Sequence, residues 1–350
     1  MKSPSGLFVI LTSLLCASSL PAWADAGYRL VPLLDDSGAT QVIATDLNRR
    51  GEVVGARSAP GHSLRAFRWR AGQFTDLHDA IDSTSSFTEA VGINDRSTIV
   101  GARYNTTTEF FEGVWIRGTQ VTPLTVLPGE TQVFPLDVNN REQFIADSDG
   151  VQSGSYFVDG DNVQLLEGLP GSFSMNAIAI NERGVVAANS WMGTGSRAVL
   201  WQDGTAMDLG LVAGATSSFV YSLNDRNQAV GIVMMGGSAR AMRWQEGTMT
   251  LLPRLVPDEA ASSPGGINNW GVIVGGVTIV QPEFRTTATL WFGNHVVELD
   301  SLVRADDPLK PFVHLSSAGH INDRGDIVVS GFDSRTPDVQ MTYFMTLFDN

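Results

Sequence analysis

The sequence predicts an all-β chain that forms a seven-bladed β-propeller, with four-stranded antiparallel blades and an N-terminal strand that joins the last blade. One observation is a phrase that occurs seven times, made of a hydrophobic residue, an Asn, a short polar turn and a run such as Val-Val-Gly. The Asn residues of the phrase are Asn48, Asn94, Asn139, Asn181, Asn224, Asn268 and Asn322. They lie 42 to 54 residues apart, a period typical of arrays whose unit is a small sheet or a pair of helices.

Each repeat contains four short runs that we interpret as strands. In the first repeat they are residues 41–47, 52–56, 65–69 and 73–77. The runs are rich in Val, Ile, Phe and Thr and are separated by Gly, Asn and Asp, which is the pattern of strands and turns. No window of ten or more residues has the 3.6-residue period of an amphipathic helix, so no such helix is predicted.

The Asn of each phrase and the aromatic residue of each third run have structural explanations. Asn can hydrogen-bond to the backbone of a tight turn, and the Gly that often follows tolerates a positive φ. A four-stranded sheet cannot bury both faces alone, so blades must pack face to face around an axis. The residues expected between the blades are Trp69, Trp115, Phe157, Trp201, Trp244, Trp291 and Phe344.

The two ends of the chain complement each other. The last repeat stops after its third strand, at residues 341–348, and residues 28–33 resemble a fourth strand that has no preceding three. Joining them closes the ring and leaves no exposed sheet edge. A count of six or eight blades stays open, because the third repeat is degenerate and the last interval is long.

Residues 1–24 have the features of a signal peptide, and residues 25–350 form the single predicted propeller domain. Lys2 is followed by an apolar stretch, 7–20, that is too short to span a bilayer, and Ala22-Trp23-Ala24 suits cleavage. We therefore expect export to the periplasm or the medium. Cys16 is the only cysteine, so the mature chain cannot use thiol catalysis or cysteine-bound zinc. No later stretch is long and apolar enough to cross a membrane.

The formal net charge of −14 disfavours nucleic acid and anionic membranes as partners. The histidines have no metal-ligand spacing, so neither a metal nor another cofactor is expected. We expect the protein to be a monomer.

The repeat resembles the bacterial extracellular HAF-repeat family over essentially the whole mature chain. The matching pieces are Arg65-Ala66-Phe67-Arg68-Trp69, the runs 197–201 and 240–244, Asp208-Leu209-Gly210 and Ile321-Asn322-Asp323-Arg324-Gly325. The chain departs from the family pattern where Arg replaces the first His of the motif, and where Phe157 replaces Trp. The resemblance implies export and a propeller-like repeat fold, and it assigns no catalytic residue.

The predicted topology separates two faces of the ring. The loops between the second and third strands, together with the connectors between blades, form one face, which we call the variable face. The Asn turns and the turns after the third strands form the other, which we call the turn face. Function commonly resides in variable loops on a rigid scaffold. The candidate ligand-binding residues there are Tyr104, Phe110, Trp191, Arg65 and Arg197. The alternative is that the aromatic side chains fold over and cover the blades.

Three residues are candidates for a catalytic set. His320, Asp46 and Asp137 occupy equivalent positions, two residues before the Asn of their blades. They could point into the central channel as an acid–base set, or bond to neighbouring strands.

The sequence leads to two hypotheses for the function of the protein. The first is an exported binding module for a glycan or an envelope protein. The alternative is a secreted polysaccharide lyase or glycoside hydrolase with its site at the channel mouth.

Overall fold

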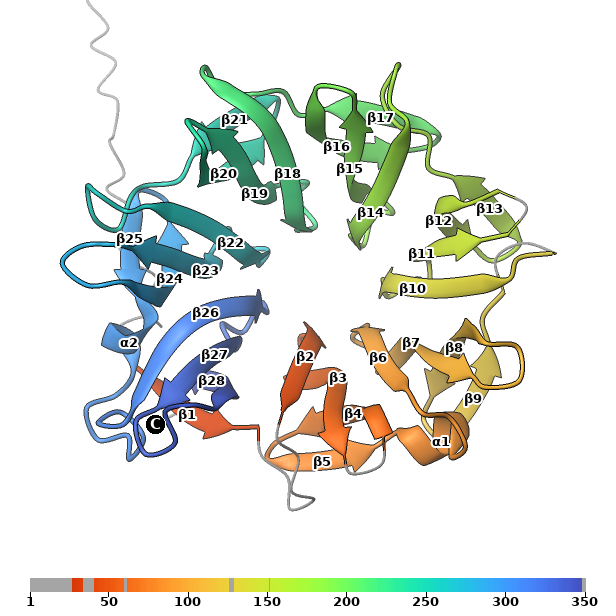
Figure 1. Ribbon diagram of the computed structural model, residues 1–350, viewed down its shortest axis with the longest axis horizontal. Coiled ribbons are helices and arrows are strands. Elements are labelled where there is room, and N and C mark those ends of the chain that lie inside the picture. Colours follow the sequence, from red (N-terminus) through yellow and green to blue (C-terminus); the bar gives the residue numbers. More distant parts are fainter. Residues whose placement is uncertain (1–26, 34–40, 60–61, 126–128, 151, 348–350) are drawn as a thin grey trace, which may run out of the picture.

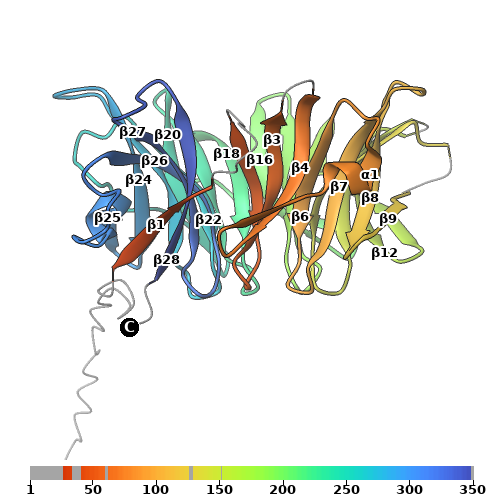
Figure 2. The same cartoon turned by 90° about the horizontal axis from the view of Figure 1, so that it is seen from below.

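The computed structural model describes residues 27–33, 41–59, 62–125, 129–150 and 152–347. The predicted signal peptide lies outside these residues. The chain forms seven four-stranded antiparallel sheets around a central axis (Figure 1). From the side they form a thick disc, with strands running between its two faces (Figure 2). The predicted seven-bladed propeller is confirmed, and the third repeat, which looked degenerate, forms a complete blade.

The strands of blades 1 to 6 follow one another from the axis outward. The innermost strands, including that of blade 7, are β2 (Val42–Leu47), β6 (Thr88–Ile93), β10 (Gln132–Val138), β14 (Ser174–Ile180), β18 (Ala215–Leu223), β22 (Ala261–Ile267) and β26 (Val313–Ile321). The second strands are β3 (Glu52–Ala59), β7 (Thr98–Asn105), β11 (Phe144–Asp149), β15 (Val186–Met192), β19 (Ala229–Met235), β23 (Ile273–Ile279) and β27 (Ile327–Asp333).

The outer half of each blade is equally regular. The third strands are β4 (His62–Arg70), β8 (Phe110–Arg117), β12 (Gly154–Asp159), β16 (Gly195–Gln202), β20 (Ser238–Gln245), β24 (Arg285–Phe292) and β28 (Gln340–Leu347). The outermost strands are β5 (Gln73–Asp76), β9 (Gln120–Pro123), β13 (Asn162–Leu165), β17 (Thr205–Asp208), β21 (Thr248–Leu251), β25 (His295–Glu298) and β1 (Tyr28–Pro32). Two helices, α1 (His78–Asp82) and α2 (Leu299–Leu302), lie in connectors. They were not predicted, because one turn is too short to show a helical period.

The N-terminal strand closes the ring as predicted. β1 pairs antiparallel with β28, from Tyr28 opposite Leu347 to Pro32 opposite Tyr343. Blade 7 thus takes its fourth strand from the other end of the chain, and Figure 1 shows β1 in red beside the blue C-terminal strands. Tyr28 is fully buried, so this strand belongs to the core as well as to the sheet.

The hydrophobic core is divided among the interfaces between blades. The buried apolar residues of the described chain form seven clusters, and each cluster spans two neighbouring blades. Trp201 of blade 4 packs on Phe157 of blade 3 with ring centroids 5.6 Å apart. Trp69 of blade 1 packs on Phe344 of blade 7 at 4.9 Å. The third-strand aromatic residues are therefore packing residues, as expected.

The repeated Asn residues form a closed ring of hydrogen bonds at the turn face. In blade 1, the Asn48 Oδ1 accepts the backbone N–H groups of Arg50 and Glu52, which fixes its own turn. Its Nδ2 donates to the backbone carbonyl of Asn94 in the next blade. The same link, 2.9 to 3.1 Å long, recurs in every blade, and Asn322 donates to Asn48 to close the circle. The sequence predicted the bond within the turn, but it did not predict the link between blades.

A β-bulge explains the glycine of the Val-Val-Gly run. Every inner strand shifts register at the residue three positions before its Asn. The bulge brings an inner-strand carbonyl close to the second strand. A Cβ built on Gly55 would lie only 2.0 Å from the carbonyl oxygen of Ile43, so a larger residue there would force the strands apart. The equivalent positions of blades 3, 4 and 7 hold Ala146, Ala188 and Val329, so this glycine is confined to blades 1, 2, 5 and 6.

Candidate functional site

The inner strands surround a central cavity of about 270 Å³. Its wall is formed mainly by the bulge residues of blades 1 to 6, the residues after the bulges in most blades, and the Asn turns. Both residues face the axis because the bulge interrupts the alternation of side chains along the strand. The bulge residues of blades 1 to 7 are Thr45, Val91, Leu136, Ile178, Tyr221, Gly265 and Gly319.

His320, Asp46 and Asp137 all line this cavity, so the fold brings the three weak catalytic candidates to one place. Burial raises the pKa of Asp46, and the nearby His320 opposes that rise. Burial, reinforced by the charge of Asp46, raises the pKa of Asp137 to about 8. Burial lowers the pKa of His320. Raised carboxyl pKa values and a lowered imidazole pKa bring these groups closer to the range in which a side chain can transfer a proton near neutral pH.

The two carboxyl groups also connect blades. The Asp46 Oδ1 accepts the N–H of Leu47, and its Oδ2 accepts the N–H of Ile93 in the next blade at 2.8 Å. Asp137 does the same with the N–H groups of Val138 and of Ile180 in the next blade, the latter at 2.9 Å. Bonding to neighbouring strands was the alternative interpretation of these residues, and it describes the geometry of both aspartates.

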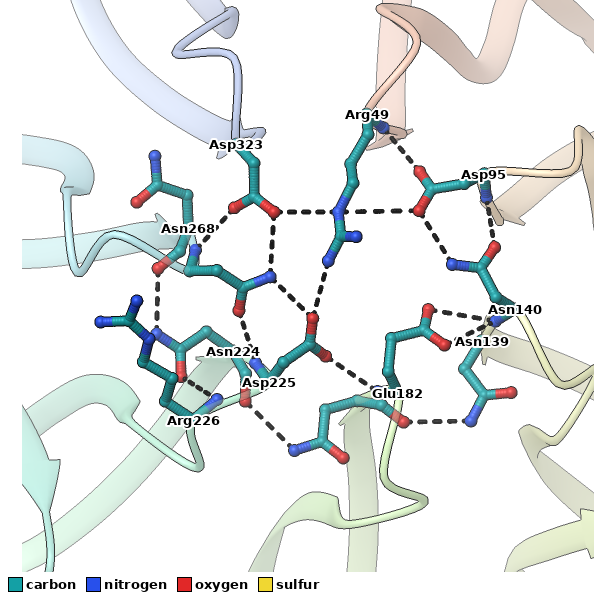
Figure 3. A network of polar contacts seen from close by, with 12 residues as sticks. Arg49, Asp95, Asn139, Asn140, Glu182, Asn224, Asp225, Arg226, Asn268 and Asp323 are labelled. Carbon is teal, nitrogen blue, oxygen red and sulfur yellow. Dashed lines mark hydrogen bonds and ion pairs between the residues drawn. The ribbon is translucent and has the colours of Figure 1, made fainter.

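A ring of charged and amide side chains surrounds the axis at the turn face. It is made by the residue after each Asn, namely Arg49, Asp95, Asn140, Glu182, Asp225, Asn269 and Asp323. The Arg49 guanidinium contacts Asp323 of the neighbouring blade 7 at 2.9 Å and Asp225 of blade 5, across the axis, at 2.8 Å (Figure 3). Sequence reasoning missed this ring. The available signal was a charged or amide residue after each Asn.

The aromatic candidates lie on the variable face in two separate places. Tyr104 is half-buried, and its ring lies 5.4 Å from that of Phe111. Phe110 is 38% exposed. Trp191, which is 36% exposed, packs edge-on against Phe219 of the next blade, with centroids 5.6 Å apart. The first two belong to blade 2 and Trp191 to blade 4, so the fold does not join them into one site.

The arginine candidates are occupied by ion pairs within their own blades. The Arg65 Nε lies 3.2 Å from an Asp76 carboxylate oxygen, and an Arg197 Nη lies 2.7 Å from Asp208. Each aspartate ends the outermost strand of its blade, so the Arg and the Asp-Leu pieces of the repeat pair with each other. These contacts account for both arginines without a ligand.

His314 is a histidine whose ring is fixed by two acceptors. Its Nδ1 lies 2.7 Å from an Asp300 carboxylate oxygen, and its Nε2 lies 2.8 Å from the Thr286 carbonyl oxygen. Both bonds can exist together only if both ring nitrogens carry a proton. The hydrogen bond to Asp300 is the main reason that the pKa of His314 is raised.

Because the folded-state pKa of His314 is raised, its stabilising contribution is present in full below the unfolded pKa and is lost as pH rises through the folded pKa. We expect His314→Gln to lower the unfolding free energy at pH 5.5 by less than about 1 kcal/mol, since the side chain is partly exposed. The loss should shrink at pH 8.5. Thermal melting at the two pH values measures this, with the exposed His295→Gln as the control. An equal loss at both pH values would contradict the protonated ring.

The residues that the structure describes contain neither a metal-ligand cluster nor a membrane-spanning helix. Within them, no three His, Asp or Glu side chains are placed to hold a metal ion. Within the same ranges, no helix has the length and apolar character needed to cross a bilayer.

Comparison with known proteins supports the fold and nothing finer. No protein-family model matches the chain, and no curated protein sequence matches it. Among solved structures, the chain is similar to an acylaminoacyl peptidase from Pyrococcus horikoshii, with a TM-score of 0.58, 10% identity, and coverage of 89% of this chain and 52% of that one. The chain thus spans about half the length of that peptidase.

Two further structures match over nearly their whole length. One is the β-propeller domain of the Trilobed protease from Pyrococcus furiosus, with a TM-score of 0.55, 9% identity, and coverage of 89% of this chain and 97% of that one. The other is YCF48 from Cyanidioschyzon merolae, with a TM-score of 0.55, 7% identity, and coverage of 91% and 99%. The first is described as having an open velcro topology, whereas here β1 pairs with β28. At these identities the likeness establishes a shared propeller architecture.

Proposed function

We propose that this chain is an exported, non-catalytic propeller that binds a glycan through its variable face. The observation that carries the proposal is the aromatic pair Phe173 and Trp191 beside the start of β14. Phe173 is 73% exposed, and its backbone N–H donates to the carbonyl of Trp191 at 3.0 Å, so the two residues are neighbours. Phe219 supports the Trp191 ring from the next blade. Rigid, partly exposed rings offer apolar faces on which a sugar ring can stack.

The structural use of the charged candidates favours binding over catalysis. Arg65 and Arg197 are paired with aspartates, and Asp46 and Asp137 accept backbone N–H groups from adjacent blades. Export and membership of the HAF-repeat family belong to this proposal, and they rest on residues 1–24 and on the repeat motif.

The test compares two exposed tryptophans on opposite faces. Trp191→Ala should weaken binding to a retained polysaccharide about tenfold, which corresponds to roughly 1.4 kcal/mol. Trp270→Ala is the matched control, because Trp270 is 60% exposed but belongs to an Asn turn at the turn face. Affinity electrophoresis through gels containing neutral or acidic polysaccharides measures the change. The proposal fails if the wild type is not retarded by any polysaccharide, or if Trp191→Ala binds as well as the wild type. Capture of an envelope protein in place of a glycan would favour a protein-binding function.

A second candidate function is supported by one specific observation, the convergence of His320, Asp46 and Asp137 in one cavity. Here the chain would be a polysaccharide lyase or glycoside hydrolase. The test is release of reducing ends, or of unsaturated-uronate absorbance, from plant and bacterial polysaccharides. An activity that survives His320→Ala would rule out this assignment of the site.

A further inference from the structure

The ring of bulge residues around the axis has a gap at blades 6 and 7. Blades 1 to 5 place side chains there, from Thr45 to Tyr221, whereas blades 6 and 7 have Gly265 and Gly319. A Cβ built on Gly265 would lie 2.3 Å from the Ala318 carbonyl oxygen, so this glycine is required where β22 and β26 approach each other. At Gly319, a Cβ would meet no atom within 4 Å. The position of Gly319 is therefore open space.

The gap leads into two hollows, one on each side of β26. One, of about 250 Å³, lies between β2 and blade 7, and the other, of about 410 Å³, lies between blades 6 and 7. His320 lines both the first hollow and the central cavity, and Gly265 lines both the second hollow and the central cavity. Gly319 lines both hollows. Because the two hollows share Gly319 and Gln340, we treat them as one feature, the β26 cleft, which adjoins the central cavity at His320 and Gly265.

The β26 cleft extends toward the variable face. Gln340, at the start of β28, lines both hollows, and Phe332, near the end of β27, lines the second. Both residues adjoin the loop between the second and third strands of blade 7. They are exposed, so a ligand in solution can reach the cleft from this side.

The chemistry of the two hollows differs from that of the rest of the molecule. No Asp, Glu, Lys or Arg is among the described residues that line either hollow, although the chain has a formal net charge of −14. Apart from the His320 imidazole, their polar side chains carry hydroxyls and amides, such as those of Ser263, Ser317 and Gln340. Apolar surface comes from Ile43 and Phe332, which are 37% and 38% exposed.

We propose that the β26 cleft is a second glycan subsite that binds a neutral sugar unit, an inference that rests on the proposed function. His320 contacts the sugar at the floor of this subsite. A neutral pyranose has hydroxyls around its edge and apolar C–H faces, and it therefore matches a wall of hydroxyls, amides and apolar side chains that has no fixed charge. An acidic sugar would find no cationic partner in either hollow, and the negative field of the chain would repel it. This subsite lies across the axis from Trp191, in other blades.

Gly319→Ile tests the subsite by filling it. The Cβ of the added side chain meets no atom within 4 Å, Gly319 is not among the positive-φ residues, and blade 4 has Ile178 at the same position. The variant should therefore keep the fold and its melting temperature. Val91→Ile is the matched control, because it enlarges the equivalent residue of blade 2, outside the two hollows.

The ligands for the test are cellotriose, maltotriose and xylotriose, with trigalacturonate as the acidic comparison. Titration calorimetry should detect binding of at least one neutral trisaccharide to the wild type, at least about tenfold weaker binding to Gly319→Ile, and unchanged binding to Val91→Ile. The imidazole NMR signals of His320 should move when the trisaccharide binds.

The outcomes separate this inference from the proposed function. If polysaccharide binding depends on Trp191 but Gly319→Ile binds trisaccharides as well as the wild type does, the subsite alone is wrong. The subsite is also wrong if trisaccharide binding leaves the His320 signals unmoved, or if trigalacturonate is the ligand preferred. If the wild type binds neither polysaccharide nor trisaccharide, both proposals fail.

Discussion

Deletion of residues 27–34 should lower the unfolding free energy by about 5 kcal/mol or more and leave little folded protein at 37 °C. The deletion removes Tyr28, Leu30 and Leu33, which are at most 7% exposed, and burial of each such side chain contributes roughly 1.5–3 kcal/mol. It also exposes the edge of β28 along the register from Tyr343 to Leu347. Because domains are stable by only about 5–15 kcal/mol in total, a loss of this size approaches complete unfolding.

Thermal melting followed by circular dichroism measures the effect. Arg29→Ala is the control, because it removes a partly exposed ion pair with Asp306 and leaves the three buried side chains in place. A synthetic peptide of residues 27–34, added to the deletion variant, should raise its melting temperature by restoring the fourth strand of blade 7. A deletion variant that melts at the wild-type temperature would show that closure by β1 does not stabilise the ring.

Asn224→Ala should lower the unfolding free energy by about 3 kcal/mol, because it leaves several buried polar groups without a partner. The Asn224 Oδ1 accepts the backbone N–H groups of Arg226 and Gln228, and its Nδ2 donates to the Asn268 carbonyl oxygen at 2.9 Å and to the Gln228 Oε1 at 2.6 Å. The side chain is buried, and each buried group left without a partner costs about 1–3 kcal/mol. Chemical denaturation measures the loss.

Asn224→Asp removes the Nδ2 donor and keeps an oxygen acceptor. Aspartate keeps an oxygen for the two N–H groups of the turn, but an ionised carboxylate has no proton to donate to the Asn268 carbonyl or the Gln228 side chain, and it places a negative charge beside both acceptors. If the Nδ2 bonds matter, Asn224→Asp should be destabilised at pH 7 by an amount comparable to that for Asn224→Ala. Asn176→Ala, at an exposed position of β14, is the control. An Asn224→Asp variant as stable as the wild type would mean that only the bond within the turn contributes.

The candidate site illustrates how far a repeat can be interpreted from sequence. Because the three residues occupy equivalent positions in their repeats, the sequence predicted that His320, Asp46 and Asp137 lie at the same level of the channel. In the structure all three line one cavity. Equivalence could not show that Asp46 and Asp137 each accept an N–H from the next blade. It also could not show that Arg65 and Arg197 pair with Asp76 and Asp208. Those bonds depend on the separation and direction of side chains on different strands.

The sequence explains some glycines of the repeat, whereas others are explained only by the structure. Gly51 and Gly55 were both visible as parts of the motif, and a turn with positive φ accounts for Gly51. Gly55 is needed for another reason, the close approach of the Ile43 carbonyl oxygen at a bulge. A bulge leaves no mark on the alternation of a six-residue strand, so sequence reasoning did not identify it. Gly319 and Gly265 occupy equivalent positions in the sequence. Only the structure shows that a side chain would clash at Gly265 and would have open space at Gly319.

The sequence by itself determined the repeat, the strands and the strand that closes the ring, and it favoured seven blades, a count that the structure confirmed. These properties depend on local patterns that recur along the chain, and on a strand missing at one end and present at the other. Tertiary structure decided how the blades are joined at the axis, which polar groups those joints use, and where space remains for a ligand. The physical reason is that these features depend on where residues of different blades lie relative to one another. The blades are joined by contacts between residues more than forty positions apart, and those contacts form only when the blades pack together.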